Sequence, residues 1–141
     1  MDFNLPAADD PRRLALREWL AHQPRRSYKE LAEAGYAVPH WPRPWGLGAD
    51  AQLQLIIDDE IARAGIRAPY HVNPVPINNC GQSLLNFGTA QQRERFLPPA
   101  LACEEIWCML FSEPGAGSDV GALRTTARRE GDHYIVRGQK I

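Results

Sequence analysis

The chain has 141 residues, a length sufficient for one domain of ordinary size, and its 16 Lys and Arg nearly balance its 17 Asp and Glu. Because no long run of one sign occurs, the composition argues against a nucleic-acid binder, which needs a basic face. No apolar stretch approaches the roughly 20 residues that cross a bilayer, so no membrane span is expected. Pairs such as Arg12-Arg13 are short and are interpreted as solvated.

The N-terminus and the cysteines indicate the compartment of the protein, and the histidines indicate whether it binds a metal. The first ten residues, MDFNLPAADD, are acidic and lack the charged-then-apolar build of a signal peptide. The three cysteines form no Cys-x-x-Cys pair and cannot all be disulfide-bonded within the chain, which predicts a reduced, cytoplasmic protein. The histidines are dispersed, so no metal site is predicted. They are His22, His40, His71 and His133.

Residues 1–104 carry helix signals and are predicted to form a helical domain. A first helix is expected after Asp10, an acidic cap followed by Pro11 at a first-turn position. A second helix is expected to start at Ser27, where Glu30 three residues later completes a capping box. Gly35 is expected to end it.

A loop rich in proline and tryptophan follows at residues 38–48. Its three prolines prohibit regular helix, and Trp41 and Trp45 are expected to anchor it in apolar surroundings. A peptide-recognition motif is the alternative, but the segment has no repeated PxxP register. After Asp50, apolar residues recur at helical spacing until Gly65, which predicts the clearest helix of the chain.

Two further helices are predicted before the composition changes. One covers residues 77–87 and ends at Gly88. The other opens at Thr89, which forms a second capping-box pattern with Gln92, and is expected to be closed by the pair Pro98-Pro99.

After Glu105 the pattern changes from helix to strand. Residues 106–112 are a compact apolar run that predicts a buried strand. Residues 123–130 and 133–137 flank Gly131-Asp132, which predicts a β-hairpin, and residues 138–141 are expected to start another strand. The predicted fold class is therefore α+β: a helical domain at 1–104, followed at 105–141 by the first strands of an antiparallel, barrel-like β domain that is truncated.

The turn between these predicted strands, Ser-Glu-Pro-Gly-Ala-Gly-Ser-Asp at residues 112–119, carries the main functional signal. Gly115 and Gly117 remove side-chain bulk, so backbone N–H groups can approach an anionic ligand, and Ser112 and Ser118 offer hydroxyl donors. The turn is neither a P-loop nor a Gly-x-Gly-x-x-Gly helix start. An ordinary surface loop is the alternative interpretation. Glu113 is expected to point away from a bound anion, with Arg124 as a candidate partner.

The same eight residues resemble, position for position, the signature of the acyl-CoA dehydrogenases: Ser/Thr-Glu, two variable residues, a small residue, then Gly-Ser/Thr-Asp. Residues 88–98 look like the helical segment that precedes this signature in the family, and residues 131–141 look like the hairpin that follows it. The order and spacing agree from about Leu14 onward.

The resemblance implies FAD as cofactor and a set of contacts to it. Phe111 and Ser112 would lie against the flavin ring, with Leu110 beside them; Gly117 and Ser118 would approach the phosphate arm, and Ser118 would also contact the acyl-CoA substrate. Leu110 and Phe111 depart from the family's usual small and aliphatic pair, which leaves the acyl group open.

The resemblance also implies the reaction and the partners. A carboxylate base removes the proton α to the thioester carbonyl, and a hydride leaves the β carbon for FAD, with an electron-transfer flavoprotein or similar acceptor and a homo-oligomeric parent. The family's base lies in a later helical domain, so no catalytic residue is assigned here, and an N-terminal fragment inactive alone is expected. Glutamates such as Glu60 are interpreted as solvated. A flavin monooxygenase of the same fold and a non-catalytic interaction chain are the alternatives.

Overall fold

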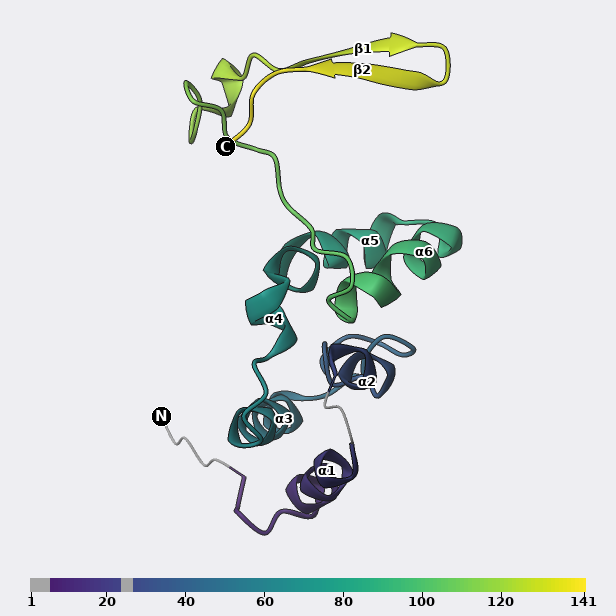
Figure 1. Ribbon diagram of the computed structural model, residues 1–141, viewed down its shortest axis with the longest axis vertical. Coiled ribbons are helices and arrows are strands. Elements are labelled where there is room, and N and C mark those ends of the chain that lie inside the picture. Colours follow the sequence, from purple (N-terminus) through teal and green to yellow (C-terminus); the bar gives the residue numbers. More distant parts are fainter. Residues whose placement is uncertain (1–5, 24–26) are drawn as a thin grey trace. The chain divides into compact units, whose positions relative to one another are not determined.

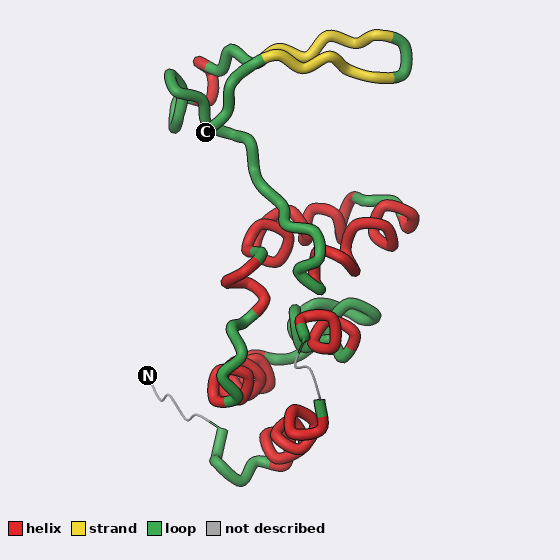
Figure 2. Tube along the Cα trace, in the orientation of Figure 1, coloured by secondary structure: helices red, strands yellow, loops and turns green. Residues whose placement is uncertain are grey.

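The computed structural model describes residues 6–23 and 27–141 and divides into two compact units, Met1–Trp107 and Cys108–Ile141. Residues 1–5, the first half of the acidic N-terminal stretch that lacks the build of a signal peptide, lie outside the described residues. The first unit is helical, and the second contains an antiparallel strand pair (Figures 1 and 2). This combination confirms the predicted α+β fold class.

The helical unit contains six α-helices within its described residues, and between two of them a π-helical segment, η1. Their bounds are α1 Pro11–His22, α2 Tyr28–Glu33, α3 Ala51–Arg63, α4 Pro69–Val72, η1 Val75–Cys80, α5 Gly81–Phe87 and α6 Ala90–Leu101. The second unit contains a short 3₁₀ turn, η2, at Val120–Ala122, followed by strands β1 Thr126–Glu130 and β2 His133–Arg137.

Four helix starts are confirmed by the side chains that cap them. Asp10 accepts a hydrogen bond from the Arg12 backbone N–H at 2.9 Å, and Asp50 accepts one from Leu53 N–H at 2.8 Å. Ser27 and Thr89 each form the predicted capping box with the residue three positions later. Each cap satisfies backbone donors that the first helical turn leaves free.

The end of α6 differs from the prediction, because the helix continues through Pro98-Pro99 to Leu101. Neither proline has an N–H to donate to the preceding turn. The last turn is held instead by apolar packing, since Leu97 and Leu101 are 0% and 2% exposed in the core. Burial of these side chains therefore outweighs the local preference against proline. The helix predicted at 77–87 begins two residues earlier, as η1, and ends at Phe87 before Gly88, as expected.

The core of the helical unit is made of two apolar clusters. One is centred on Trp41 and contains Ala37, Val38, Trp41, Ile77, Leu97 and Leu101. The other joins α1, α2 and α3 through Leu16, Leu20, Leu31, Ile57 and Ile61. The side chain of Trp41 is fully buried and Trp45 packs against the same cluster, so the predicted anchoring of the proline-rich loop is confirmed. A methyl group on Gly81 would lie 2.4 Å from the Trp41 ring, which explains a glycine at the start of α5.

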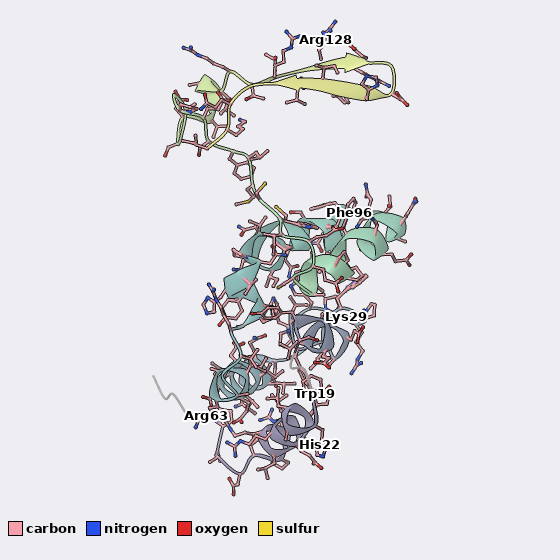
Figure 3. The ribbon with its side chains drawn as sticks, in the orientation of Figure 1. Trp19, His22, Lys29, Arg63, Phe96 and Arg128 are labelled. Atoms are coloured by element: carbon pink, nitrogen blue, oxygen red, sulfur yellow. The ribbon has the colours of Figure 1, made fainter. Side chains whose placement is uncertain are left out.

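A buried ion cluster connects α1 to α3, and it corrects the interpretation of Arg13 and Glu60 as solvated. The Glu60 side chain is 2% exposed and accepts hydrogen bonds from Arg13 at 2.5 Å and from Arg17 at 2.6 and 2.9 Å. The Arg13 side chain is 7% exposed and also pairs with Asp59, which lies on α3 with its second partner, Arg63 (Figure 3). Both charges are buried because each has partners of opposite sign.

Asn73, between α4 and η1, connects segments that are distant in the sequence. Its fully buried amide donates to the carbonyl oxygens of Ala100 at 2.9 Å and Glu105 at 2.8 Å. Its oxygen accepts a hydrogen bond from the Trp107 N–H at 3.0 Å. One side chain thus fixes both the end of α6 and the segment that follows it.

In the second unit, the predicted hairpin is confirmed. Strands β1 and β2 pair antiparallel, with Thr126 opposite Arg137 and Glu130 opposite His133. Arg128 projects from the middle of β1 (Figure 3). Gly131 in the turn has φ = 65°, a left-handed conformation that glycine adopts without strain.

The strand predicted at residues 106–112 is wrong, and so is the strand start at 138–141. Neither stretch has strand structure, and Ile106, Leu110 and Phe111 are 62%, 62% and 70% exposed. The backbone N–H of Ile141 donates to the Ser112 carbonyl at 3.1 Å, but this single bond does not form a ladder. A strand requires a paired neighbour along its length, and an apolar run cannot supply that partner by itself.

Candidate functional site

The candidate site is the glycine loop, residues 113–118, together with the residues just before it. The loop is closed by two backbone hydrogen bonds between Glu113 and Ala116, from Glu113 N–H at 2.8 Å and from Ala116 N–H at 3.0 Å. Glu113 and Ala116 are buried, whereas Gly115, Gly117 and Ser118 are exposed. The base of the loop is therefore packed and its tip faces outward.

The Glu113 carboxylate is the main anchor of the loop. It accepts hydrogen bonds from Arg124 N–H at 2.8 Å, from Thr125 N–H at 2.9 Å, from the Thr125 hydroxyl at 2.5 Å and from the Lys140 ammonium at 3.0 Å. The Thr125 hydroxyl, with the Arg124 N–H and Lys140, lowers the pKa of Glu113 to about 2. Glu113 thus contacts the backbone of Arg124 rather than its guanidinium, and its cationic partner is Lys140.

The tip of the loop presents backbone donors that the protein itself does not use. Within residues 6–23 and 27–141, no acceptor is bonded to the N–H groups of Gly115, Gly117, Ser118 or Asp119. All four residues are exposed, so their N–H groups are open to a ligand with acceptor oxygens.

The two glycines of the loop are not required by the surrounding chain. A methyl group on Gly115 or on Gly117 would meet no described atom within 4 Å. Neither residue has the positive φ that would favour glycine. The space next to the backbone is therefore open, as expected where a ligand approaches the main chain closely.

The predicted site residues lie on one continuous stretch. Leu110 and Phe111 expose most of their surface immediately before the loop, and Ser112 is half-buried. Gly117 and Ser118 are at the exposed end of the loop. All five are therefore within nine residues along the chain, on the same unit.

Sequence reasoning missed Thr125 and Lys140, which reach the loop from both ends of the hairpin. Thr126 pairs with Arg137, so the segment that enters the hairpin and the segment that leaves it lie side by side. Thr125 on the first segment and Lys140 on the second therefore both reach Glu113. The hairpin signal and the register of its strands could have identified them, since the two flanking segments of any hairpin lie side by side.

The helical unit has a separate apolar groove that the sequence did not suggest. It has a volume of about 590 Å³ and is lined mainly by Leu84, Phe87, Phe96 and Trp107, with Glu105 at its polar edge. Phe87 is 88% exposed, and the rings of Phe96 and Trp107 meet edge to face with centroids 6.4 Å apart. Such a surface suits an apolar ligand.

The described part of the chain offers neither a metal-binding cluster nor a membrane-spanning helix. Among those residues, no three or more His, Cys, Asp or Glu side chains come together in a way that could hold a metal ion. None of the described helices has the length and apolar character needed to cross a membrane.

Comparison with known proteins identifies the family. Residues 9–104 match the family described as acyl-CoA dehydrogenase, N-terminal domain. The chain belongs to the acyl-CoA dehydrogenase family. Members of this family are flavoproteins that use FAD, and the sequence resemblance that led to the family is therefore confirmed.

Individual relatives agree with this assignment. Acyl-CoA dehydrogenase FadE34 of Mycobacterium tuberculosis is 44% identical over 111 residues, covering 79% of this chain and 15% of the relative. Acyl-CoA dehydrogenase IpdE1 of the same organism is 40% identical over 127 residues, covering 89% and 32%. The chain therefore spans about a third or less of the length of these dehydrogenases.

A solved structure supports the fold as well. The ChsE4-ChsE5 complex from Mycobacterium tuberculosis contains a chain that is 33% identical to this one, with a TM-score of 0.68. The similarity covers 100% of this chain and 39% of that chain. A steroid acyl-CoA dehydrogenase, Tcur3481-Tcur3483, gives a TM-score of 0.69 at 31% identity, covering 100% and 41%.

The glycine loop of this structure fits the family's cofactor. FAD carries a diphosphate and a ring with carbonyl oxygens, which need hydrogen-bond donors and room beside the backbone. The free N–H groups at Gly115, Gly117 and Ser118 supply donors, and the open space at both glycines supplies room. The exposed Phe111 supplies an apolar surface for a flat ring.

Proposed function

We propose that this chain forms part of an FAD-dependent acyl-CoA dehydrogenase, which introduces an α,β double bond into an acyl-CoA thioester. In this proposal, residues 1–104 are the N-terminal helical domain and residues 105–141 are the beginning of the middle β domain. The membership of the chain in the family and the names of its relatives favour dehydrogenation over oxygen activation.

The single observation that carries the proposal is the glycine loop, with its unused backbone donors and its two glycines that the chain's own packing does not require. The packing of the described chain requires neither feature. A loop that binds an oxygen-rich cofactor through its main chain needs both of them.

The proposal gives the residues of this stretch separate roles. The backbone of Gly117 and Ser118 would hold the phosphate arm of FAD, while Leu110, Phe111 and Ser112 would lie along the flavin ring. The chemistry that FAD supplies when bound is the acceptance of a hydride from the β carbon of the substrate. The protein's own contribution here is to bind and orient, so the proposal assigns no catalytic base to these residues.

The proposal also covers the acyl-CoA substrate, the electron acceptor and the oligomeric state of the parent protein. Ser118 would also contact the acyl-CoA, and the acyl group is left open by the residues of the loop. The similar Tcur3481-Tcur3483 protein is named as a steroid acyl-CoA dehydrogenase, and this name favours a bulky acyl group as the substrate in our proposal. An electron-transfer flavoprotein or similar acceptor and an oligomeric parent complete the proposal; the related ChsE4-ChsE5 protein was solved as a complex.

A titration of the complete 141-residue chain with FAD tests the loop directly. Backbone ¹⁵N–¹H spectra are recorded while FAD is added to millimolar concentration, which detects weak binding. We expect saturable shifts of the Gly115, Gly117 and Ser118 amide signals. Gly117→Leu should abolish them, because its first side-chain carbon would meet no described atom within 4 Å and the side chain would extend into the space that the ligand needs.

The matched control is Gly121→Leu, outside the loop on η2, where a first side-chain carbon would make ordinary contact with Asp119 at 3.4 Å. This variant should bind FAD as the unchanged chain does. If millimolar FAD leaves the loop amides unshifted, or shifts a different set of amides, the proposed role of the loop is wrong.

A further inference from the structure

We infer that Glu113 and Lys140 are positioning residues, whose ion pair holds the glycine loop in its open conformation before any ligand arrives. The inference rests on the proposed function, because it assigns to this pair the preparation of the proposed FAD-binding loop. Neither side chain is placed in contact with the cofactor.

The first step in the argument is the burial and bonding of Glu113. This residue is 8% exposed, although glutamate is rarely buried unless its charge is paired. Its oxygens accept four hydrogen bonds, which come from Arg124, Thr125 and Lys140, residues 11 to 27 positions away in the sequence. Charge-assisted bonds of this kind are the strong ones, so the carboxylate is fixed to both ends of the hairpin.

The second step is the double contact made by Lys140. Its ammonium group donates to Glu113 at 3.0 Å and also to the carbonyl oxygen of Phe111 at 3.0 Å. Its side chain is only 17% exposed, so the ion pair is partly shielded from water and salt. Together with the bond from Ile141 N–H to the Ser112 carbonyl, Lys140 holds the backbone on the entry side of the loop.

The third step is that few contacts hold the exposed tip of the loop. Within the described chain, its closing contacts are the two backbone bonds between Glu113 and Ala116, the burial of Ala116 and a bond from Val120 N–H to the Ser118 carbonyl at 3.1 Å. A first side-chain carbon on Gly115 or Gly117 would meet no described atom within 4 Å. Glycines lose more conformational freedom on ordering than other residues, so this loop is costly to fix. The anchored Glu113 sets the direction in which the tip and its free donors point.

The expected consequence is preorganisation. A ligand that binds one conformation of a loop has its affinity reduced by the fraction of molecules in which that conformation is present. If loss of the ion pair lowers that fraction to about one tenth, the affinity for FAD falls about tenfold. The hairpin itself, held by its own ladder, should persist.

The experiment uses the complete 141-residue chain with three substitutions at the pair: Lys140→Met, Lys140→Arg and Glu113→Gln. The matched control is Glu130→Gln, which removes the charge of an exposed glutamate paired with Arg128 on the same hairpin. Backbone ¹⁵N relaxation without ligand reports the order of the loop, and FAD titration reports affinity. Signals from the β1–β2 ladder report whether the hairpin is intact.

We expect the order parameters at Gly115, Gly117 and Ser118 to fall from about 0.85 to below about 0.6 in Lys140→Met and Glu113→Gln. FAD should then bind about tenfold more weakly. Lys140→Arg, which keeps the charge, should restore most of both values, and Glu130→Gln should change neither.

Two outcomes would overturn the inference. One is that the loop stays as ordered in Lys140→Met and Glu113→Gln as in the unchanged chain. The other is that the β1–β2 ladder is lost together with the order of the loop, because the ion pair would then stabilise the whole second unit and not the loop in particular. A different result would contradict the proposed function alone. In that result the order of the loop depends on Lys140 as expected, but millimolar FAD shifts none of the loop amide signals.

Discussion

Replacing Glu60 by glutamine is expected to destabilise the helical unit severely, although the substitution changes the side-chain shape very little. Glu60 is 2% exposed and receives three hydrogen bonds from Arg13 and Arg17. Glutamine keeps one acceptor oxygen but no charge, which leaves the buried guanidinium of Arg13 with Asp59 as its remaining anionic partner. The Nε of Arg13 is already buried without a described hydrogen-bond acceptor.

The expected magnitude follows from this geometry. Removing one partner of a buried ion pair costs about 3–5 kcal/mol, because a charge is left in a poorly solvated place. With a denaturant dependence of about 2 kcal/mol per molar urea, the unfolding midpoint should fall by roughly 1.5–2.5 M. Replacing Arg13 and Glu60 together by methionine should cost much less than Glu60→Gln, since no buried charge would be left unpaired.

The assay is urea unfolding followed by tryptophan fluorescence. All four tryptophans lie in the helical unit, at positions 19, 41, 45 and 107, so the signal reports that unit alone. The matched control is Glu105→Gln, which removes the charge of a glutamate 39% exposed in its pair with Arg95; such surface pairs contribute about 0–1 kcal/mol. If Glu60→Gln and Glu105→Gln unfold at the same urea concentration, the buried cluster does not stabilise the unit.

Three further substitutions and conditions test other parts of the structure. Gly81→Ala would place a carbon 2.1 Å from the Pro76 carbonyl oxygen, and we expect a loss of about 1–3 kcal/mol in the fluorescence assay. Asn73→Leu should cost roughly 2–4 kcal/mol in the same assay, because the partly buried Glu105 carbonyl and Trp107 N–H lose their Asn73 partner and the Ala100 carbonyl keeps its bond from Cys103 N–H but loses that from Asn73. The pKa of Glu113 is lowered from its ordinary 4.5 to about 2, so its stabilisation of the glycine loop is complete above pH 4.5 and is lost as the pH falls through 2. Amide signals of Gly115, Gly117 and Ser118 between pH 7 and 2 should show this loss while the β1–β2 ladder persists, and Glu113→Gln should remove that step.

The features that could be predicted from the sequence are those whose cause is local. Caps at Asp10, Ser27, Asp50 and Thr89 need only a side chain and the backbone two or three residues later, and all four are present. The hairpin turn at Gly131 is local in the same sense. The residue types within a few positions were therefore sufficient to predict the helix caps and the hairpin turn.

The features that failed depend on residues far along the chain. Leu97 and Leu101 keep α6 helical across two prolines only because they pack into a core that includes residues 37–41. Glu60 is buried because Arg13 and Arg17, more than 40 positions earlier, meet it. No periodicity along a single segment reports such partners.

The candidate site was predicted only in part, for the same reason. The glycine loop was found from its residue types, but the way in which Thr125 and Lys140 anchor it was not, since it depends on the register of the hairpin. Residues 106–112 were expected to be a buried strand because they are apolar. Burial also requires a neighbouring strand, which residues 106–112 do not have in this structure.

The side chain of Asn73 has a consequence for how the chain tolerates change. Its last partner is the N–H of Trp107, which is also the final residue of the helical unit. The hydrogen bonds that organise this unit are therefore complete before Cys108. An insertion next to Met109 would therefore lengthen the connection to the glycine loop without removing any of the hydrogen bonds described within the helical unit.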